Sequence, residues 1–341
     1  MNKLLSIEAA VLLLLVITSI FVRIGIVGGD AQELPQEQLQ GSQPPQPSES
    51  TPAPVPTDPS QPEETEPPIK LTFGEDFSLE SRDYFVYDCG EENLMAISGE
   101  LDEKIYPASI TKLFTAYVAL QHLDPDQTVK LGKEVYMVAS NSSLAYLKNG
   151  QTIPVSQLVE GMLLPSGNDA AYALAVAAAR AHSGKASMEP QDALEYFVGM
   201  MNDTAQAVGM TGSHFANPDG YHDFDHYTTS GDLITIARLA LSSDLIRRCT
   251  SINTDRVTFS NGDVAVWNNT NALIDPESQY YHEDAIGLKT GHTGYAGFCV
   301  LSAFELDGEY IIVGTFGCVR PEDRFIDALK LYDLVLDAKA E

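Results

Sequence analysis

Basic residues are scarce in this chain of 341 residues, which has 20 Lys and Arg against 48 Asp and Glu and a formal net charge of -28. Proteins that bind nucleic acid neutralise its phosphates with Lys and Arg, and anionic lipid surfaces attract the same residues. The scarcity therefore argues against nucleic acid as a partner and against binding to an anionic lipid surface. In so acidic a protein, a site that contains lysines would be a local positive spot suited to an anionic group.

Cysteine is also rare, and the spacing of its four positions does not resemble a zinc site. The cysteines are Cys89, Cys249, Cys299 and Cys318. A two-residue turn at Asp307-Gly308 would place Cys299 opposite Phe316 and Cys318 opposite Gly297, so that the Cα atoms of Cys299 and Cys318 are roughly 7–8 Å apart. Because this separation exceeds the usual disulfide range, we expect four free thiols.

Long apolar runs are absent after the first 27 residues. The stretch from Ala9 to Val22 carries no charge, and Glu8 and Arg23 flank it. Such a segment is either a single membrane anchor or a signal peptide with a weak cleavage site at Gly29-Asp30-Ala31. Its length just suffices for a span, and we favour an uncleaved anchor over residues 1–27. Both alternatives place the rest of the chain outside the cytoplasm, and the anchor places it on the extracytoplasmic face of the cell membrane.

Residues 28–75 contain little that could form a core. Proline alternates there with Gln, Ser, Thr and Glu, and no Lys or Arg occurs between Arg23 and Lys70. Such a composition cannot bury enough apolar surface to fold, and proline-rich chains are extended and semi-rigid. We therefore expect a disordered tether at 28–75, followed by a folded domain at 76–341.

Two periodicities alternate within residues 76–341. Apolar alternation between turn signals predicts strands, and apolar runs with Gly and Pro at their ends predict helices. Ser230 is the expected N-cap of the helix that it begins. The strands are expected at 83–88, 94–97, 256–259, 264–267, 285–290, 296–305 and 310–319, and the helices at 155–164, 170–181, 192–208, 230–242 and 322–337. This order predicts an α/β (α+β) fold, in which an antiparallel sheet is flanked by helices and an all-helical subdomain is inserted.

The most informative stretch is Pro107-Ala108-Ser109-Ile110-Thr111-Lys112, which opens an apolar helical run. Residues three apart share one face of a helix, so the Lys112 amine can reach the Ser109 hydroxyl. A lysine whose pKa is lowered by burial or by another cation can take the serine's proton. The helix N-terminus adds partial positive charge where an acyl oxyanion would form. Alone, Ser-x-x-Lys is a weak signal, because about one match is expected by chance.

Two further motifs lie downstream of this stretch. Ser166-Gly167-Asn168 lies between two helices, and it can offer a hydroxyl and an amide to a substrate. The alternative is an ordinary helix cap. Lys289-Thr290-Gly291 lies at the end of a strand, where a cation and a hydroxyl can hold a carboxylate and the glycine lets a substrate backbone approach the strand edge. The alternative there is an edge strand protected by a lysine.

The motifs occur in the order Ser109-x-x-Lys112, Ser166-x-Asn168 and Lys289-Thr290-Gly291, and in this order the chain resembles the penicillin-recognising serine enzymes. It looks most like the low-molecular-mass penicillin-binding proteins that are D-Ala-D-Ala carboxypeptidases. The stretches 141–144 and 214–220 add to the resemblance. It implies a β-lactamase/transpeptidase-like fold and a serine-type carboxypeptidase that removes the terminal D-alanine from peptidoglycan stem pentapeptides through an acyl-enzyme.

The resemblance also implies which residues form the site. Ser109 would be the nucleophile and Lys112 its general base, and the backbone amides of Ser109 and His292 would form the oxyanion hole. The catalytic residues implied are Ser109, Lys112, Ser166 and Asn168, and the substrate-binding residues implied are Lys289, Thr290, Gly291, His292 and, in a looser match, Arg320. No cofactor and no metal are implied, and scattered histidines are more often structural.

The resemblance implies peptidoglycan stem peptides ending in D-Ala-D-Ala as substrates and β-lactam antibiotics as inhibitors. Many relatives continue into a C-terminal β-domain or a C-terminal anchor, whereas this sequence ends after a predicted helix, so we expect the N-terminal segment to provide any membrane attachment. One alternative is a β-lactamase of the same superfamily, although Glu189 and Glu195 do not lie in the Glu-x-x-Leu-Asn pattern of efficient class A enzymes. A non-catalytic penicillin or muropeptide sensor is the other, and the complete motifs argue against it.

Overall fold

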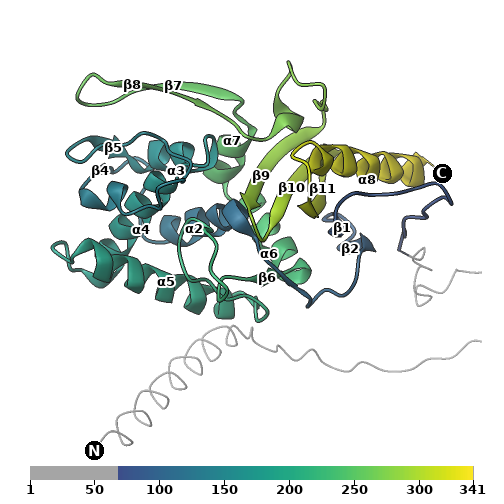
Figure 1. Cartoon of the computed structure of the whole chain (residues 1–341), viewed down its shortest axis with the longest axis horizontal. Helices are drawn as coiled ribbons and strands as arrows, with labels where there is room; N and C mark the ends of the chain where they lie inside the picture. The colour runs from purple at the N-terminus through teal and green to yellow at the C-terminus, as the bar shows by residue number, and fades with distance from the viewer. Residues whose placement is uncertain (1–67, 341) are drawn as a thin grey trace, which may run out of the picture. The chain divides into compact units, whose positions relative to one another are not determined.

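The computed structural model describes residues 68–340 (Figure 1). The chain divides into two units, Met1–Glu64 and Thr65–Glu341, and only the second unit is described. The predicted N-terminal segment at 1–27 and most of the predicted tether at 28–75 lie outside the described residues. At the end of that tether, the Leu71 side chain is buried and its backbone N–H donates to the carbonyl of Met95 at 3.0 Å. Packing of the chain on the domain therefore begins before residue 76.

A five-stranded antiparallel sheet with the order β2-β1-β11-β10-β9 forms one half of the domain (Figure 1). Its strands are β1 (Asp83–Asp88), β2 (Asn93–Ile97), β9 (Ala285–Thr293), β10 (Gly297–Leu306) and β11 (Glu309–Cys318). Successive side chains of a strand point to opposite faces, so Phe85 belongs to one hydrophobic core and its neighbour Val86 to the other. The strand β9 lies at one edge of the sheet, where one side of its backbone has no neighbouring strand.

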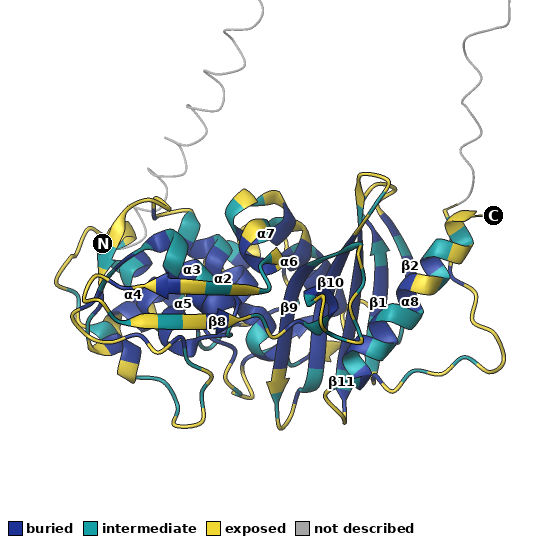
Figure 2. Cartoon of the chain, turned by 90° about the horizontal axis from the view of Figure 1, so that it is seen from above, coloured by how far each residue is buried: buried dark blue, intermediate teal, exposed yellow. Residues whose placement is uncertain are grey.

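Helices cover both faces of this sheet. α8 (Asp323–Ala340) contacts β10 and β11 on one face, and α6 (Ser230–Ser242) contacts β1 and β11. Because neither face is left to water, the middle residues of β10 and β11 are buried one after another without alternation (Figure 2). The predicted antiparallel sheet flanked by helices is confirmed.

The chain leaves the sheet after β2 and returns with β9, and the segment between them forms a helical region. Its central helix is α2 (Thr111–Leu120), which has eight buried residues out of ten and contacts α3, α4, α5 and α6. The remaining helices are α3 (Val155–Leu163), α4 (Asn168–Ser183), α5 (Pro190–Ala207) and α7 (Asp244–Ser251). The predicted helical insertion is confirmed, and the predicted helices end within three residues of the observed ones.

Short elements connect the helices. They are the strand pairs β3 (Lys104–Ile105) with β6 (Thr228–Thr229), β4 (Thr128–Lys130) with β5 (Thr152–Pro154) and β7 (Thr254–Thr258) with β8 (Val264–Asn268), and the 3-10 turns η1 (Ala108–Ile110), η2 (Lys133–Tyr136) and η3 (Ala272–Ile274). The β7–β8 ribbon is held by Trp267, whose buried indole N–H donates to the carbonyl of Ala145 at 3.0 Å.

Two local expectations were wrong. Thr229 rather than Ser230 caps α6, because the Thr229 side chain accepts a hydrogen bond from the backbone N–H of Asp232. The β10–β11 hairpin keeps the expected register only as far as its irregularity near Phe298, where Cys318 pairs with Phe298. A bulge inserts an extra residue and shifts every later pair.

The cysteine expectation is confirmed, since all four thiols are free. Burial raises the pKa of the Cys299 thiol to about 11 and that of Cys249 to about 12, so these groups are protonated at neutral pH. Over residues 68–340, no helix has the length and apolar character that crossing a membrane requires.

Candidate active site

Ser109 lies in η1, the 3-10 turn that leads directly into α2. The sequence predicted one helical turn for Ser109 and Lys112, and the structure provides a 3-10 turn followed by an α-helix. Ser109 precedes Lys112 by three residues, which is about one helical turn, and the Lys112 Nζ donates a hydrogen bond to the Ser109 Oγ at 2.8 Å. The predicted serine–lysine pair is therefore in direct contact.

Lys112 is fully buried, and its Nζ also donates to the carbonyl of Asp219 at 2.7 Å. Burial lowers the pKa of Lys112 to about 8, while the negative charges of Asp219 and Asp169 act in the opposite direction. A lysine with this pKa is partly neutral in mildly basic solution, and a neutral amine can accept the serine's proton.

Ser166 lies in the sharp turn between α3 and α4, and Asn168 is the first residue of α4. Ser166 has a φ of +61°, and a Cβ on Gly167 would lie 2.5 Å from the carbonyl of Gly161. The turn therefore requires a glycine between the two polar residues. The Asn168 Nδ2 donates to the Ser142 Oγ at 2.9 Å, which ties the turn to a neighbouring loop.

Asp169 holds this loop, residues 142–147, in place beside the cleft. Its carboxylate accepts hydrogen bonds from the backbone N–H groups of Ala145 and Leu147 at 2.8 and 2.9 Å. Burial raises the pKa of Asp169, and these backbone hydrogen bonds partly offset that rise.

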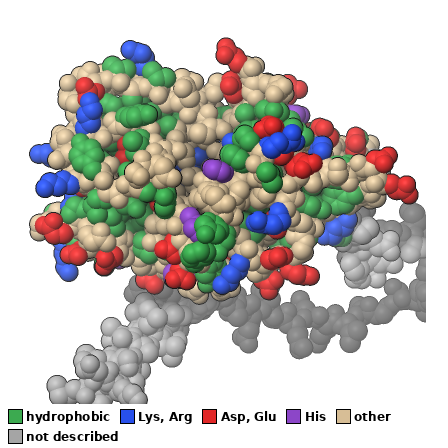
Figure 3. Space-filling view, viewed as in Figure 1, with side chains coloured by type: hydrophobic (Ala, Val, Ile, Leu, Met, Phe, Trp, Pro, Cys, Tyr) green, Lys and Arg blue, Asp and Glu red, His purple; other side chains and the backbone are tan. Residues whose placement is uncertain are grey.

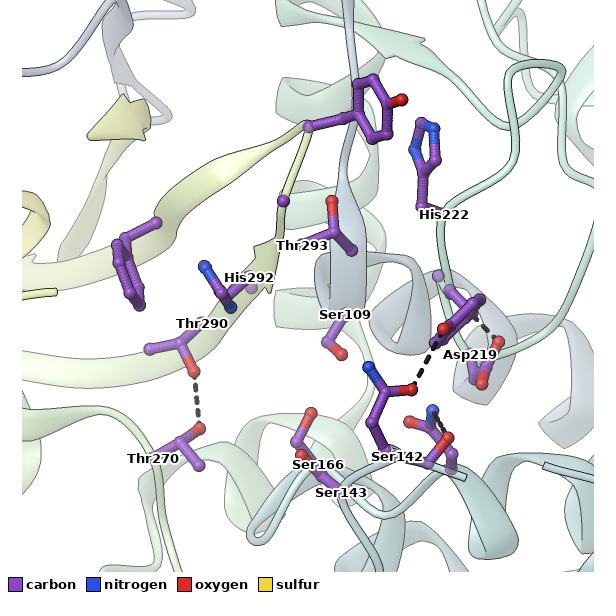
Figure 4. A pocket seen from close by; sticks show the side chains of 18 of the residues that line it. Ser109, Ser142, Ser143, Ser166, Asp219, His222, Thr270, Thr290, His292 and Thr293 are labelled. Atoms are coloured by element: carbon purple, nitrogen blue, oxygen red, sulfur yellow. Dashed lines mark hydrogen bonds between the residues drawn. The ribbon is translucent and has the colours of Figure 1, made fainter. Parts of the chain in front are cut away.

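Lys289 and Thr290 lie on β9, as predicted. The Thr290 Oγ1 is 2.6 Å from the Thr270 Oγ1 (Figure 4), and the Lys289 Nζ donates to Thr270 Oγ1 at 3.3 Å. Lys289 is fully buried, and burial together with the positive charges of Lys112 and Arg324 lowers its pKa well below the usual value.

Gly291 allows β9 to approach the nucleophile turn. A Cβ at this position would lie 2.9 Å from the carbonyl of Pro107 and 3.2 Å from the backbone N of Ser109. A larger residue would therefore push the strand away from the serine. The next residue, His292, is exposed, and its ring stacks on Phe298 with the centroids 4.0 Å apart.

These elements enclose a cleft of about 540 Å³. Six of the predicted site residues line it, namely Ser109, Ser166, Asn168, Thr290, Gly291 and His292. Figure 4 shows Ser109, Ser166 and Thr290 around one opening. The two lysines are buried behind this lining, where Lys112 reaches Ser109 and Lys289 reaches the Thr270–Thr290 pair. The structure therefore brings together the three motifs that the sequence keeps apart.

Arg320 is the predicted residue that the structure does not bring to the cleft. It does not belong to the cleft lining, and its Nε donates to the Asp323 carboxylate at 3.0 Å. Arg324, four residues further along the chain and in the first turn of α8, lines the cleft instead, and its Nη1 donates to the carbonyl of Gly291 at 3.4 Å. The buried Nε of Arg324 has no hydrogen-bond partner among the described residues, and burial lowers the pKa of its guanidinium.

A sequence signal for Arg324 existed. It stands in the first turn of α8, where the helix dipole disfavours a cation, so a basic residue there points to a role other than helix stability. Sequence reasoning also missed Thr270, for which no signal stands out, and Asp219, which lies within the noted stretch 214–220. The Asp219 carboxyl is buried beside Lys112, and burial raises its pKa while the charge of Lys112 opposes that rise.

Comparisons with known proteins agree with this geometry. The D-alanyl-D-alanine carboxypeptidase family (peptidase S11) matches residues 72–318. A D-alanyl-D-alanine carboxypeptidase of Streptomyces sp. K15 is 31% identical over 67% of this chain and 78% of its own. The carboxypeptidase DacF of Bacillus subtilis is 29% identical, and the match covers 68% of this chain and 56% of DacF. The carboxypeptidase DacA of Escherichia coli is 32% identical, and the match covers 67% of this chain and 54% of DacA. The chain thus spans only about half the length of the last two relatives.

Solved structures give the same result. The Streptomyces K15 DD-transpeptidase has a TM-score of 0.68 with 28% identity, over 76% of this chain and 98% of its own. Penicillin-binding protein D2 of Listeria monocytogenes, in its cefotaxime-bound form, has a TM-score of 0.62 with 25% identity, over 77% of this chain and 100% of its own. Because the family model covers most of the described domain and the three motifs meet at one cleft, this chain belongs to the D-alanyl-D-alanine carboxypeptidase family of serine peptidases.

Proposed function

We propose that this protein removes the terminal D-alanine from peptidoglycan stem peptides that end in D-Ala-D-Ala, through an acyl-enzyme on Ser109. One observation carries the proposal: a fully buried lysine with a pKa of about 8 donates a hydrogen bond to a serine that lines a cleft. A serine is activated as a nucleophile when a neighbouring group can take its proton. Membership of the family supports the reaction, and peptides of this kind are the substrate class that the family's name states.

Acylation follows from the positions of the groups. Neutral Lys112 takes the proton of Ser109, whose Oγ attacks the carbonyl carbon between the two D-alanines. The oxyanion accepts hydrogen bonds from the backbone amides of Ser109 and His292, which the close approach of Gly291 to the Ser109 backbone supports. Ser166, which lines the same opening, can pass a proton to the leaving amine. Water then cleaves the ester and restores the serine.

The free carboxylate of the substrate has a matching group of donors. Thr290 and Arg324 line the cleft, and the buried Lys289 lies directly behind them. A carboxylate bound there would be held by charge-assisted hydrogen bonds. A β-lactam carries a carboxylate and a reactive carbonyl, so we infer that it enters the same cleft and acylates Ser109.

The test uses purified full-length protein, a fluorescent penicillin and peptides ending in D-Ala-D-Ala. Wild type should be labelled covalently and should release D-alanine, and Ser109→Ala should do neither while keeping its thermal unfolding midpoint. Ser251→Ala, an exposed serine in another Ser-x-Asn stretch, is the matched control and should behave like wild type.

Three other outcomes would contradict the proposal. Labelling of Ser109→Ala at another serine would refute the nucleophile. Rapid turnover of benzylpenicillin without D-alanine release would indicate a β-lactamase. Covalent labelling of wild type without benzylpenicillin turnover and without D-alanine release would indicate a penicillin or muropeptide sensor.

We further propose that the N-terminal segment anchors the protein in the membrane and that the domain works on the extracytoplasmic face. The support is the uncharged stretch from Ala9 to Val22 and the location of peptidoglycan outside the membrane. Mass spectrometry of the protein from its native membrane should find the intact N-terminus. A mature chain that begins near Gln32 in the soluble fraction would refute the anchor.

A further inference from the structure

The side chain of His226 is buried beside the loop 216–225, and the reaction proposed above does not use it. Figure 3 shows histidine side chains at the surface near the middle of one face of the domain, whereas His226 is only 2% exposed. The next residue fixes its backbone, because Tyr227 and His214 exchange two backbone hydrogen bonds of 2.9 and 3.0 Å. The His226 ring also meets the Phe215 ring edge-on, with the centroids 5.6 Å apart. A buried imidazole held in this way needs a partner for each ring nitrogen.

Both nitrogens of the His226 ring have such partners. The backbone N–H of Ala216 donates to Nδ1 at 3.1 Å, and Nε2 lies 2.8 Å from the Thr111 Oγ1. A ring nitrogen that accepts a hydrogen bond carries no proton, so the proton of the neutral ring is on Nε2 and is donated to Thr111. Burial lowers the pKa of His226 to about 3, so the ring stays neutral from pH 6 to pH 10. The ionisable groups around it are Asp223, His214, His222 and Lys112.

The loop that starts at residue 216 holds the general base. The carbonyl of Asp219 accepts a hydrogen bond from the Lys112 Nζ at 2.7 Å, and the carbonyl of Pro218 accepts one from the Thr115 Oγ1 at 2.7 Å. A neutral amine has two N–H groups and one lone pair. A carbonyl that takes one N–H of Lys112 therefore limits how far the lone pair can turn away from the serine. The position of this carbonyl thus affects proton transfer.

The same loop lies against the nucleophile turn, and His226 connects the two. A Cβ on Gly220 would be 1.8 Å from the carbonyl of Ala108 and 2.9 Å from the Thr111 Oγ1. Thr111 is buried, and it is the first residue of α2 and the neighbour of Lys112. The two hydrogen bonds of the His226 ring therefore join the start of the loop to the start of the helix that carries the base.

We propose that His226 is a positioning residue for the serine–lysine pair. It bridges the loop and the nucleophile helix, and in this way it keeps the carbonyl of Asp219 on the Lys112 amine. Because His226 does not belong to the cleft lining, its effect falls on acylation and not on the binding of substrate. This inference rests on the proposed function.

The experiment measures acylation of the purified full-length protein by benzylpenicillin, at several concentrations and from pH 6 to pH 10. His226→Phe keeps a ring but removes both hydrogen bonds. The limiting acylation rate should fall about 10- to 100-fold, as expected for a displaced base, and the penicillin concentration at half saturation should change less than about twofold. Protonated Lys112 is also less well held in this variant, so the midpoint of its pH profile should move to lower pH.

Further variants test the bridge itself. Thr111→Val removes the hydroxyl that accepts from His226, and it should lower the limiting rate about threefold to tenfold, the loss expected for one hydrogen bond. Added to His226→Phe, it should lower the rate little further, because both changes break the same bridge. His226→Asn can still accept from Ala216 through its amide oxygen, so its rate should lie between those of wild type and His226→Phe.

His182→Phe is the matched control, because it changes an exposed histidine of α4 outside the cleft lining. It should keep the wild-type rate and the wild-type midpoint.

Wild-type limiting rates in both His226→Phe and Thr111→Val would overturn the inference. A lower rate in His226→Phe with a pH midpoint that stays in place or moves to higher pH would also overturn it, because His226 would then support the fold without positioning the base. If wild type itself is not acylated at Ser109, it is the proposed function that fails. Should His226→Phe not fold, the rate and the midpoint of Thr111→Val decide the matter.

Discussion

Two buried lysines serve the cleft from different elements, Lys112 from α2 and Lys289 from β9, and the charges around them differ in sign. Lys112 has the carboxylates of Asp219 and Asp169 as its charged neighbours, which partly oppose the effect of burial on its pKa. Lys289 has only the cations Lys112 and Arg324, and these reinforce the effect of burial. The two lysines are therefore equally buried, but the charges around them act on their pKa values in opposite directions.

This difference suits two different tasks. A lysine with a pKa near 8 can lose and regain a proton at moderate pH, which a general base must do. A lysine that is destabilised as a cation by its neighbours gains most when an anion arrives, because an opposite charge nearby favours the charged form. In the proposed reaction, the α2 side of the cleft would transfer the proton and the β9 side would bind the carboxylate.

The largest effect should come from removing the base. Lys112→Met keeps an unbranched side chain that is one atom shorter but cannot accept a proton, so the rate of acylation by penicillin should fall about 10²- to 10⁴-fold. Stopped-flow or gel-based labelling measures this rate, and circular dichroism checks the fold. Lys330→Met, on a partly exposed lysine of α8 outside the cleft lining, is the control and should leave the rate unchanged. A loss of less than about tenfold in Lys112→Met would mean that another group takes the proton.

A smaller effect should come from the β9 side. Arg324→Ala removes a cation from the cleft, and its kcat/KM for peptides with a free terminal carboxylate should fall about 10- to 100-fold, the size expected for a hydrogen bond to a charged group. Arg320→Ala, in the turn just before α8, is the matched control. It should change kcat/KM less than twofold, because Arg320 pairs with Asp323 outside the cleft. Equal losses of kcat/KM in the two variants, or a loss in Arg320→Ala alone, would mean that Arg320 contributes to binding the substrate carboxylate.

The smallest effect concerns the charge beside Lys112. Asp219→Asn removes a negative charge that favours protonated Lys112, so the pKa of Lys112 should fall further and the pH profile of acylation should move to lower pH. Acylation rates between pH 6 and 10, compared with wild type, measure the shift. A shift to higher pH would mean that the Asp219 carboxyl does not act on Lys112 through its charge.

The sequence predicted those parts of the fold that are built from local signals. Glycine and proline between apolar runs marked α3, α4 and α5, and the Asp307-Gly308 turn marked the β10–β11 hairpin. It missed α7, a short polar helix whose apolar face becomes evident only where it packs against β9, α3 and α6. It also missed the irregularity at Phe298, because a bulge has no spacing signal of its own.

Within the site, the motif residues were predictable, and their neighbours were not. Ser109 and Lys112 are three apart, so their contact follows from helical geometry alone. The contact of Thr270 with Thr290 depends on how two distant segments pack. The choice between Arg320 and Arg324 depends on which side of the first turn of α8 faces β9. Local spacing cannot supply either of these facts.

The pH dependence of Ser109 acylation in the wild-type protein tests the central claim most directly. If neutral Lys112 is the base, the second-order rate constant for acylation by benzylpenicillin should rise with pH and level off with an apparent pKa of about 8. The rise has this sign because the base must first lose its own proton. A rate constant that stays level from pH 6 to pH 10, or that falls over this range, would contradict the claim.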